Sequence, residues 1–173
     1  MKKFYYDDPE VGLDPATCHP HFNELMQEDF YFDCVDELAP FGNDDGAATL
    51  SKLEDWYRKR KGKADIVEFM FNLIDGFGFK YACDGCVQLL DMDEINQLMD
   101  EDEFFIDCMD QAVIATVLGQ LKIEGKIDPR LKELGFITIE RQKLITQQYN
   151  TSNLPNSWLE RLEVMKTDLE KVK

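Results

Sequence analysis

The most apolar stretch of the chain, from Phe104 to about Leu121, is the feature that most restricts its fold. A helix with this much apolar surface has to be covered by other elements before it is stable in water. We therefore expect this stretch to form a helix at the centre of the fold. Its large apolar residues are Phe105, Ile106, Met109, Val113, Ile114, Val117, Leu118 and Leu121.

The segments that precede this stretch also have helical patterns. From residue 47 the pattern is helical, with Ser51 and Glu54 at capping-box spacing, and it predicts a helix that ends in the basic run 58–62. Residues 64–75 are apolar on nearly all sides, which predicts a second central, buried helix. We expect a further helix over about 80–90, a short turn over 94–99, and an acid cluster over 100–103 at the start of the central helix.

Two more helices are predicted after the central stretch. The apolar residues from Leu131 to Ile145 predict one helix, with a potential interruption at Gly135. Ser157 and Glu160 form a second capping box, and the apolar residues that follow recur at spacings of four and three. One face of this last helix must therefore be buried.

Residues 1–46 differ from the rest, because they contain four of the six prolines and many turn residues. We expect loops there, with a short helix over 21–26, and we expect the aromatic side chains of this arm to wrap around the body. Regular alternation of apolar and polar residues is confined to 30–35, so β structure is minor. The prediction is an all-α single domain, 1–173, with a loop-rich arm, 1–46, and a helical body of about six or seven helices, 47–173.

Charge is distributed unevenly along the chain. Residues 1–110 hold 27 Asp and Glu against 9 Lys and Arg, whereas residues 111–173 hold 8 against 10, and the net charge is −16. Such a field repels nucleic acid and anionic membranes and favours basic partners or cations. The hydrophobic share of 44% is too high for a disordered acidic tail, so we expect a folded protein.

The sequence predicts a cytoplasmic protein with free thiols. Lys2 and Lys3 are followed by acidic residues and not by the apolar segment of a signal peptide, and no window reaches the roughly 18 apolar residues of a membrane span. Five cysteines form an odd set in a chain large enough to fold without disulfides. We expect Cys34 and Cys108 to lie in the core, because free cysteine behaves as a small apolar residue.

One constellation has the composition of a metal site. It joins the run Cys18, His19 and His21 with the pair Cys83 and Cys86, which together offer enough ligands for a tetrahedral zinc shell. The runs are 62 residues apart, which matches no compact zinc module, so buried or surface thiols are the simpler interpretation. Residues 43–46 and 91–94 bring oxygen ligands together, but neither segment fits an EF-hand loop.

The acidic run after residue 90 is the candidate interaction site. Solvated helix faces are one interpretation of such runs, and a surface that steers a basic partner is the other. Phe104 follows the run directly and would supply an apolar anchor. The acids are Asp91, Asp93, Glu94, Asp100, Glu101, Asp102 and Glu103.

Three segments resemble a family of uncharacterised bacterial proteins typified by YfeS. They are residues 14–20 (DPATCHP), 39–46 (APFGNDDG) and 124–128 (EGKID). The resemblance implies a bacterial cytosolic protein of unassigned activity, and it brings no catalytic residues. It also implies that position 18 varies, which weakens the zinc alternative.

The sequence contains no nucleophile elbow, phosphate loop or dinucleotide-binding pattern, so it favours a protein without catalytic activity. We expect a binding module of the inhibitor, immunity or nucleic-acid-mimic type, which needs no cofactor and engages a protein with a basic surface. One alternative is a metal-binding protein or metal-dependent enzyme that uses the cysteines and histidines. The other is a housekeeping protein whose acidity serves solubility alone.

Overall fold

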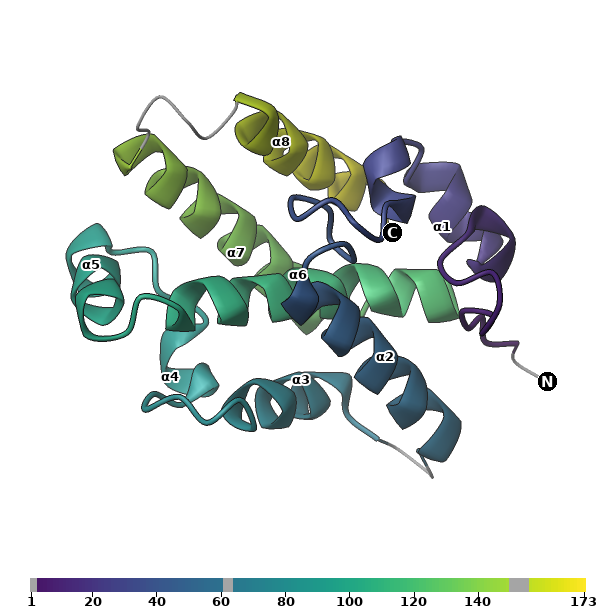
Figure 1. Ribbon diagram of the computed structural model, residues 1–173, viewed down its shortest axis with the longest axis horizontal. Coiled ribbons are helices and arrows are strands. Elements are labelled where there is room, and N and C mark those ends of the chain that lie inside the picture. The colour runs from purple at the N-terminus through teal and green to yellow at the C-terminus, as the bar shows by residue number, and fades with distance from the viewer. Residues whose placement is uncertain (1–2, 61–63, 150–155) are drawn as a thin grey trace.

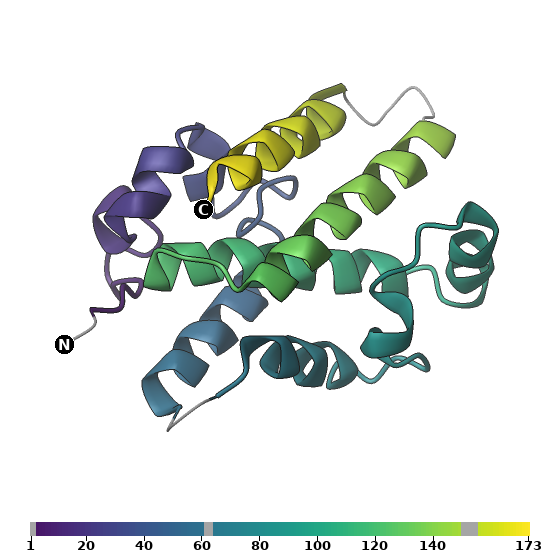
Figure 2. The ribbon, with the colours of Figure 1, turned by 180° about the vertical axis from the view of Figure 1, so that it is seen from behind.

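Helix α6, Phe105–Glu124, lies at the centre of the computed structural model, which describes residues 3–60, 64–149 and 156–173. Seventeen of its 20 residues are buried, on all sides of the helix. Helices α2 and α7 cross it on opposite faces, as the two opposite views show (Figure 1, Figure 2). The prediction that the most apolar stretch forms the central helix is confirmed.

The other helices surround α6. Helix α8 packs on α7. Helices α3 and α4 lie below the first half of α6, and α1 lies at the C-terminal end of α6 (Figure 1). The part of the chain that is described contains no β-strand, only an isolated bridge between Asp8 and Gly12, so the all-α class is confirmed. The α-helices besides α6 are α1 (Pro20–Leu25), α2 (Asp44–Lys59), α3 (Ile66–Asp75), α4 (Cys83–Cys86), α5 (Met92–Glu101), α7 (Pro129–Gln148) and α8 (Asn156–Lys171), and two 3-10 helices cover Pro15–Thr17 and Asp29–Phe32.

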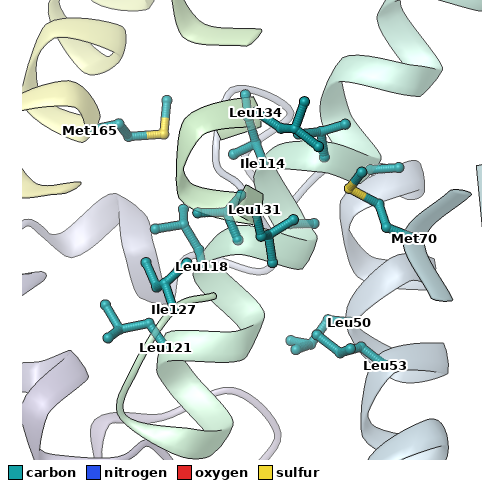
Figure 3. Close-up of a cluster of buried hydrophobic side chains, with 14 of the residues drawn as sticks. Leu50, Leu53, Met70, Ile114, Leu118, Leu121, Ile127, Leu131, Leu134 and Met165 are labelled. Atoms are coloured by element: carbon teal, nitrogen blue, oxygen red, sulfur yellow. The ribbon is translucent and has the colours of Figure 1, made fainter. Parts of the chain in front are cut away.

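The core brings α2, α3, α6, α7 and α8 together around leucine and methionine side chains (Figure 3). Two glycines allow the helices to cross closely. A Cβ atom at Gly119 would lie 2.8 Å from Cδ2 of Leu53 on α2, and one at Gly135 would lie 3.1 Å from Cγ2 of Val117 on α6. Gly135 is therefore a packing residue inside an unbroken α7, and the predicted interruption there does not occur.

Two helix predictions, for α2 and α3, differ from the structure. Helix α2 begins at Asp44, because Oδ1 of Asn43 accepts a hydrogen bond from the Gly46 amide at 2.7 Å, and Ser51 therefore lies inside the helix. Its last residue is Lys59, within the predicted basic end, of which residues 61 and 62 lie outside the described ranges. Helix α3 is not central, since only Ile66, Val67, Met70 and Ile74 on one face are buried.

The predicted helix over 80–90 is wrong, because only α4, Cys83–Cys86, is helical there. The rings of Phe79 and Tyr81 pack against Phe105 at centroid distances of 5.5 and 5.4 Å, and this contact holds the preceding chain in a loop. The short turn predicted over 94–99 is a full helix, α5, whose N-cap is Asp91.

The last helix has the predicted apolar face. Trp158, Leu162, Met165, Leu169 and Val172 are all buried. Ser157 lies inside α8, which begins at Asn156, so the N-cap predicted at Ser157 does not match the described helix.

The N-terminal arm wraps around the C-terminal end of α6, as predicted. The amide of Tyr5 donates to the Ile123 carbonyl at 3.0 Å, and the amide of His19 donates to the Lys122 carbonyl at 2.8 Å. The hydroxyl of Tyr31 donates to the buried Asp168 carboxylate on α8 at 2.9 Å. The arm is therefore part of the folded unit, and it ends at Asn43, slightly before the predicted boundary.

Candidate interaction surface at the acidic corner

Helix α5 projects sideways from the bundle at the start of α6, with a bend of 112° between the two helices (Figure 1). Ile95 is its one fully buried residue. No single helix in the described ranges is both long and apolar enough to cross a membrane, although α5 and α6 reach that length and hydropathy when counted together. We call the seven predicted acids from Asp91 to Glu103, with Phe104, the acidic corner.

Three acids of this corner have partners within the fold. Oδ1 of Asp91 accepts from the amides of Asp93 and Glu94 and caps α5, and Asp102 accepts from the Phe104 amide at 3.2 Å. Glu101 accepts from Tyr81 and from Lys80, whose Nζ lies 2.9 Å away. These hydrogen bonds lower the pKa of Glu101 to about 2.

The other four acids are available to a partner. Asp93, Glu94, Asp100 and Glu103 are exposed, and their side chains form no hydrogen bond or ion pair with any residue that the structure describes. The sequence from 81 to 121 contains no Lys or Arg. The structure thus leaves an uncompensated negative surface at this corner.

Phe104 lies beside these acids and is 62% exposed, which is unusual for a phenylalanine in a folded protein. It borders a hollow of about 320 Å³ between α5, the start of α6 and the end of α7. The other lining residues are Met99, Glu103, Ile106, Asp107, Gln142 and Ile145.

A fully buried ion pair holds the corner in place. Nη2 of Arg141 on α7 lies 2.6 Å from Oδ1 of Asp110 on α6, and both side chains are 0% exposed. Desolvation raises the pKa of Asp110, and the hydrogen bonds from Arg141 and Gln142 oppose that rise. Nη1 of Arg141 also donates to the carbonyls of Val87 and Leu89, at 2.9 and 2.8 Å. Arg141 therefore fixes the chain that leads from α4 into α5.

A second buried polar cluster lies at the other end of α6. Nζ of Lys122 is fully buried and contacts Asp7 at 2.8 Å and Glu54 at 3.1 Å. The hydroxyl of Tyr57 donates to Oε2 of Glu124 at 2.6 Å. These contacts join the arm and α2 to α6.

The structure does not bring the predicted metal ligands together. Within the described ranges, no three His, Cys, Asp or Glu side chains form a group that could hold a metal ion. Cys18, His19 and His21 lie around Lys122 and Gly125, whereas Cys83 and Cys86 lie near Asp110 and Arg141. Residues 110 and 122 of one helix are about 18 Å apart, which is too far for shared ligation.

The buried thiols belong to the core, and each of the two oxygen-rich runs begins with a helix N-cap. Burial raises the pKa of Cys18 and of Cys83 to about 12, so both favour the unreactive thiol form. Cys34 is exposed, and Cys108 is half-buried and not among the core residues, so the prediction that both lie in the core is wrong. Asn43 and Asp91, which begin the two oxygen-rich runs, are helix N-caps.

These features define an acidic all-α protein whose buried ion pairs fix its helices and whose α5 corner exposes unpaired carboxylates. The chain is similar to an uncharacterised protein of Escherichia coli (strain K12), YfeS, with which it shares 37% identity over 146 residues, 83% of this chain. The predicted resemblance to the YfeS-like family of uncharacterised bacterial proteins is thereby confirmed. The chain spans 58% of the length of YfeS. No family model and no solved structure matches the chain.

Proposed function

We propose that the protein is a non-catalytic binding module, of the inhibitor, immunity or nucleic-acid-mimic type, that engages a partner protein with a basic surface through the acidic corner. The observation that carries the proposal is the combination of four unpaired, exposed acids with the exposed ring of Phe104 at one corner. An exposed aromatic anchor with charged residues around its rim is an arrangement that protein interfaces use.

The physical role of each part differs. The carboxylates raise the association rate by long-range attraction, which salt weakens because the Debye length falls to about 8 Å at physiological ionic strength. The ring of Phe104 and the hollow beside it provide apolar surface, whose burial slows dissociation and depends little on salt. Binding should therefore weaken with salt mainly through its association rate.

The test is capture of basic proteins by the immobilised chain at low and at high salt, followed by kinetics on a purified captured protein. One variant neutralises the four unpaired acids of the corner, and a control variant changes the net charge equally at four exposed acids elsewhere. The corner variant is Asp93→Asn, Glu94→Gln, Asp100→Asn and Glu103→Gln, and the control is Glu10→Gln, Glu133→Gln, Glu160→Gln and Glu170→Gln.

The proposal predicts that the control retains the basic partner while the corner variant loses it through a lower association rate. Equal losses in both variants would show that net charge alone attracts basic proteins. Capture of neutral or acidic proteins only would also contradict the proposal.

A further inference from the structure

A second hollow adjoins the one beside Phe104. It has a volume of about 350 Å³ and lies between α6, α7, the start of α8 and the arm. The two hollows share Asp107, Gln142 and Ile145 in their linings, so they adjoin each other across these side chains over α6 and α7, and we call the pair of hollows the α6–α7 groove. The second hollow is also lined by Glu37, Leu38, Gln111, Thr146, Tyr149 and Trp158.

The groove combines an apolar floor with acidic edges. Met99, Ile106 and Ile145 line the part beside α5, and Leu38 and Trp158 line the part beside α8. Glu37, Glu103 and Asp107 are its charged residues, and no Lys or Arg occurs among the lining residues of either hollow. A ligand that fits the groove must therefore be apolar on one side and positively charged on the other.

Asp107 is the acid that lines both hollows. It retains access to water, but it lies in the hollow with protein atoms on several sides and with Asp110 and Asp45 nearby. Desolvation and these two carboxyl groups raise the pKa of Asp107. A cationic group in the groove would relieve this repulsion and strengthen its own binding.

We propose that the α6–α7 groove binds a basic amphipathic segment of the partner protein, a helix whose leucine-like side chains rest on the floor and whose Lys or Arg side chains reach Glu37, Glu103 and Asp107. This inference rests on the proposed function and specifies how the partner binds. A second copy of this chain is a poor occupant, because its net charge of −16 repels the groove.

The size of the groove agrees with such a segment. The lining residues at the end of α7 run from Gln142 to its C-cap Tyr149, and these positions are seven residues apart, which corresponds to about 10 Å along a helix. Two turns of a partner helix cover this length and present three or four apolar residues to one side. The exposed ring of Phe104 lies at one end and Trp158 at the other.

The test uses a synthetic 14-residue peptide of Lys and Leu in which leucine recurs at helical spacing. A scrambled peptide of the same composition has the same charge but no apolar face. Binding is followed by Trp158 fluorescence in a Trp56→Phe background, which leaves Trp158 as the single tryptophan. The expected result is binding of the amphipathic peptide at least about 10-fold tighter than the scrambled one, with a change in Trp158 emission.

Groove variants give the second measurement. Ile145→Asn and Asp107→Asn should each weaken binding about 5-fold to 20-fold, by the loss of one apolar contact or one charge contact. Ile137→Asn changes an equally half-buried isoleucine of α7 outside the groove, and it should change affinity less than about 2-fold. Circular dichroism confirms that each variant is folded.

The outcomes separate this inference from the proposed function. If the peptide binds but only the corner variant weakens it, or if the scrambled peptide binds equally well, the groove is not the docking site and the acidic corner still is. If neither peptide binds and no basic protein is captured, both proposals fail.

Discussion

The buried pair of Asp110 and Arg141 gives the sharpest test of the energetics of this fold. Asp110→Asn leaves the Arg141 charge buried without a counter-charge. Arg141→Met likewise leaves the Asp110 carboxylate buried without a counter-charge. Breaking a buried pair from one side costs about 3–5 kcal/mol. This is a large part of the roughly 5–15 kcal/mol by which a domain is stable.

The double variant should cost clearly less than the sum of the single variants. It removes both charges, and apolar or neutral replacement of a whole buried pair is close to neutral. The remaining cost comes from the carbonyls of Val87 and Leu89, which lose the guanidinium and contribute about 1–3 kcal/mol each. The coupling energy should therefore reach at least about 2 kcal/mol.

The assay is urea unfolding monitored by circular dichroism. Unfolding free energies are compared between variants whose dependence on urea concentration, the m value, is equal, because an equal m value indicates an unchanged unfolded state. The exposed pair Lys59 and Asp55, with Nζ 3.4 Å from Oδ2, is the control. Its cycle of Lys59→Met and Asp55→Asn should give a coupling below about 1 kcal/mol. Additivity of the Asp110 and Arg141 variants within about 0.5 kcal/mol would refute the reasoning.

Three further predictions follow from single residues. Gly125→Ala should destabilise the protein by about 2–4 kcal/mol, because φ is +75° and a Cβ atom would lie 2.2 Å from the His19 ring. Gly78→Ala, with φ +81° and open space, should cost only about 1 kcal/mol by the same unfolding assay. Hydrogen bonds from Arg130 lower the pKa of Asp65 and of Asp128, so their contribution to stability is present above pH 3.8 and is lost as pH falls. Arg130→Gln should therefore be less stable than the parent at neutral pH, and the difference should shrink below pH 3.8; a constant difference would contradict this. Cys34 is the exposed cysteine, so a thiol reagent should modify one cysteine rapidly in the folded protein, and Cys34→Ser should abolish that fast phase.

The parts of the fold that could be predicted are those for which the residues of one continuous stretch indicate the structure without contacts to distant residues. The apolar content of 104–121 placed α6 at the centre, and the spacing from Trp158 to Val172 identified the buried face of α8. Helix α2 was placed too late because Ser51 and Glu54 have capping-box spacing, while Asn43 performs the capping. The sequence offers two N-cap signals there, one at Asn43 and one at Ser51, and only the tertiary structure shows which of them begins the helix.

The missed features depend on contacts between distant residues. The chain over 80–90 is mostly a loop, because Phe79 and Tyr81 pack on Phe105. Helix α3 lies at the side of the bundle with one face buried, because α6 occupies the centre. The acids of the corner were predicted, but the α6–α7 groove was not, since α6, α7, α8 and the arm all line it. One signal was present in the sequence: Asp110 and Lys122 are charged residues within or beside the most apolar stretch. Charged residues there require buried partners.

The burial of α6 on every side has a consequence for how the chain folds during synthesis. Residues 105–124 leave the ribosome after α2 and before α7 and α8, so one face of this helix has a partner while the opposite face is still bare. Until α7 has also emerged from the ribosome, the nascent chain carries an exposed apolar surface that chaperones would bind. Ribosome pauses at the stage when α6 has emerged and α7 has not should therefore increase aggregation more than pauses of equal length before α6 emerges.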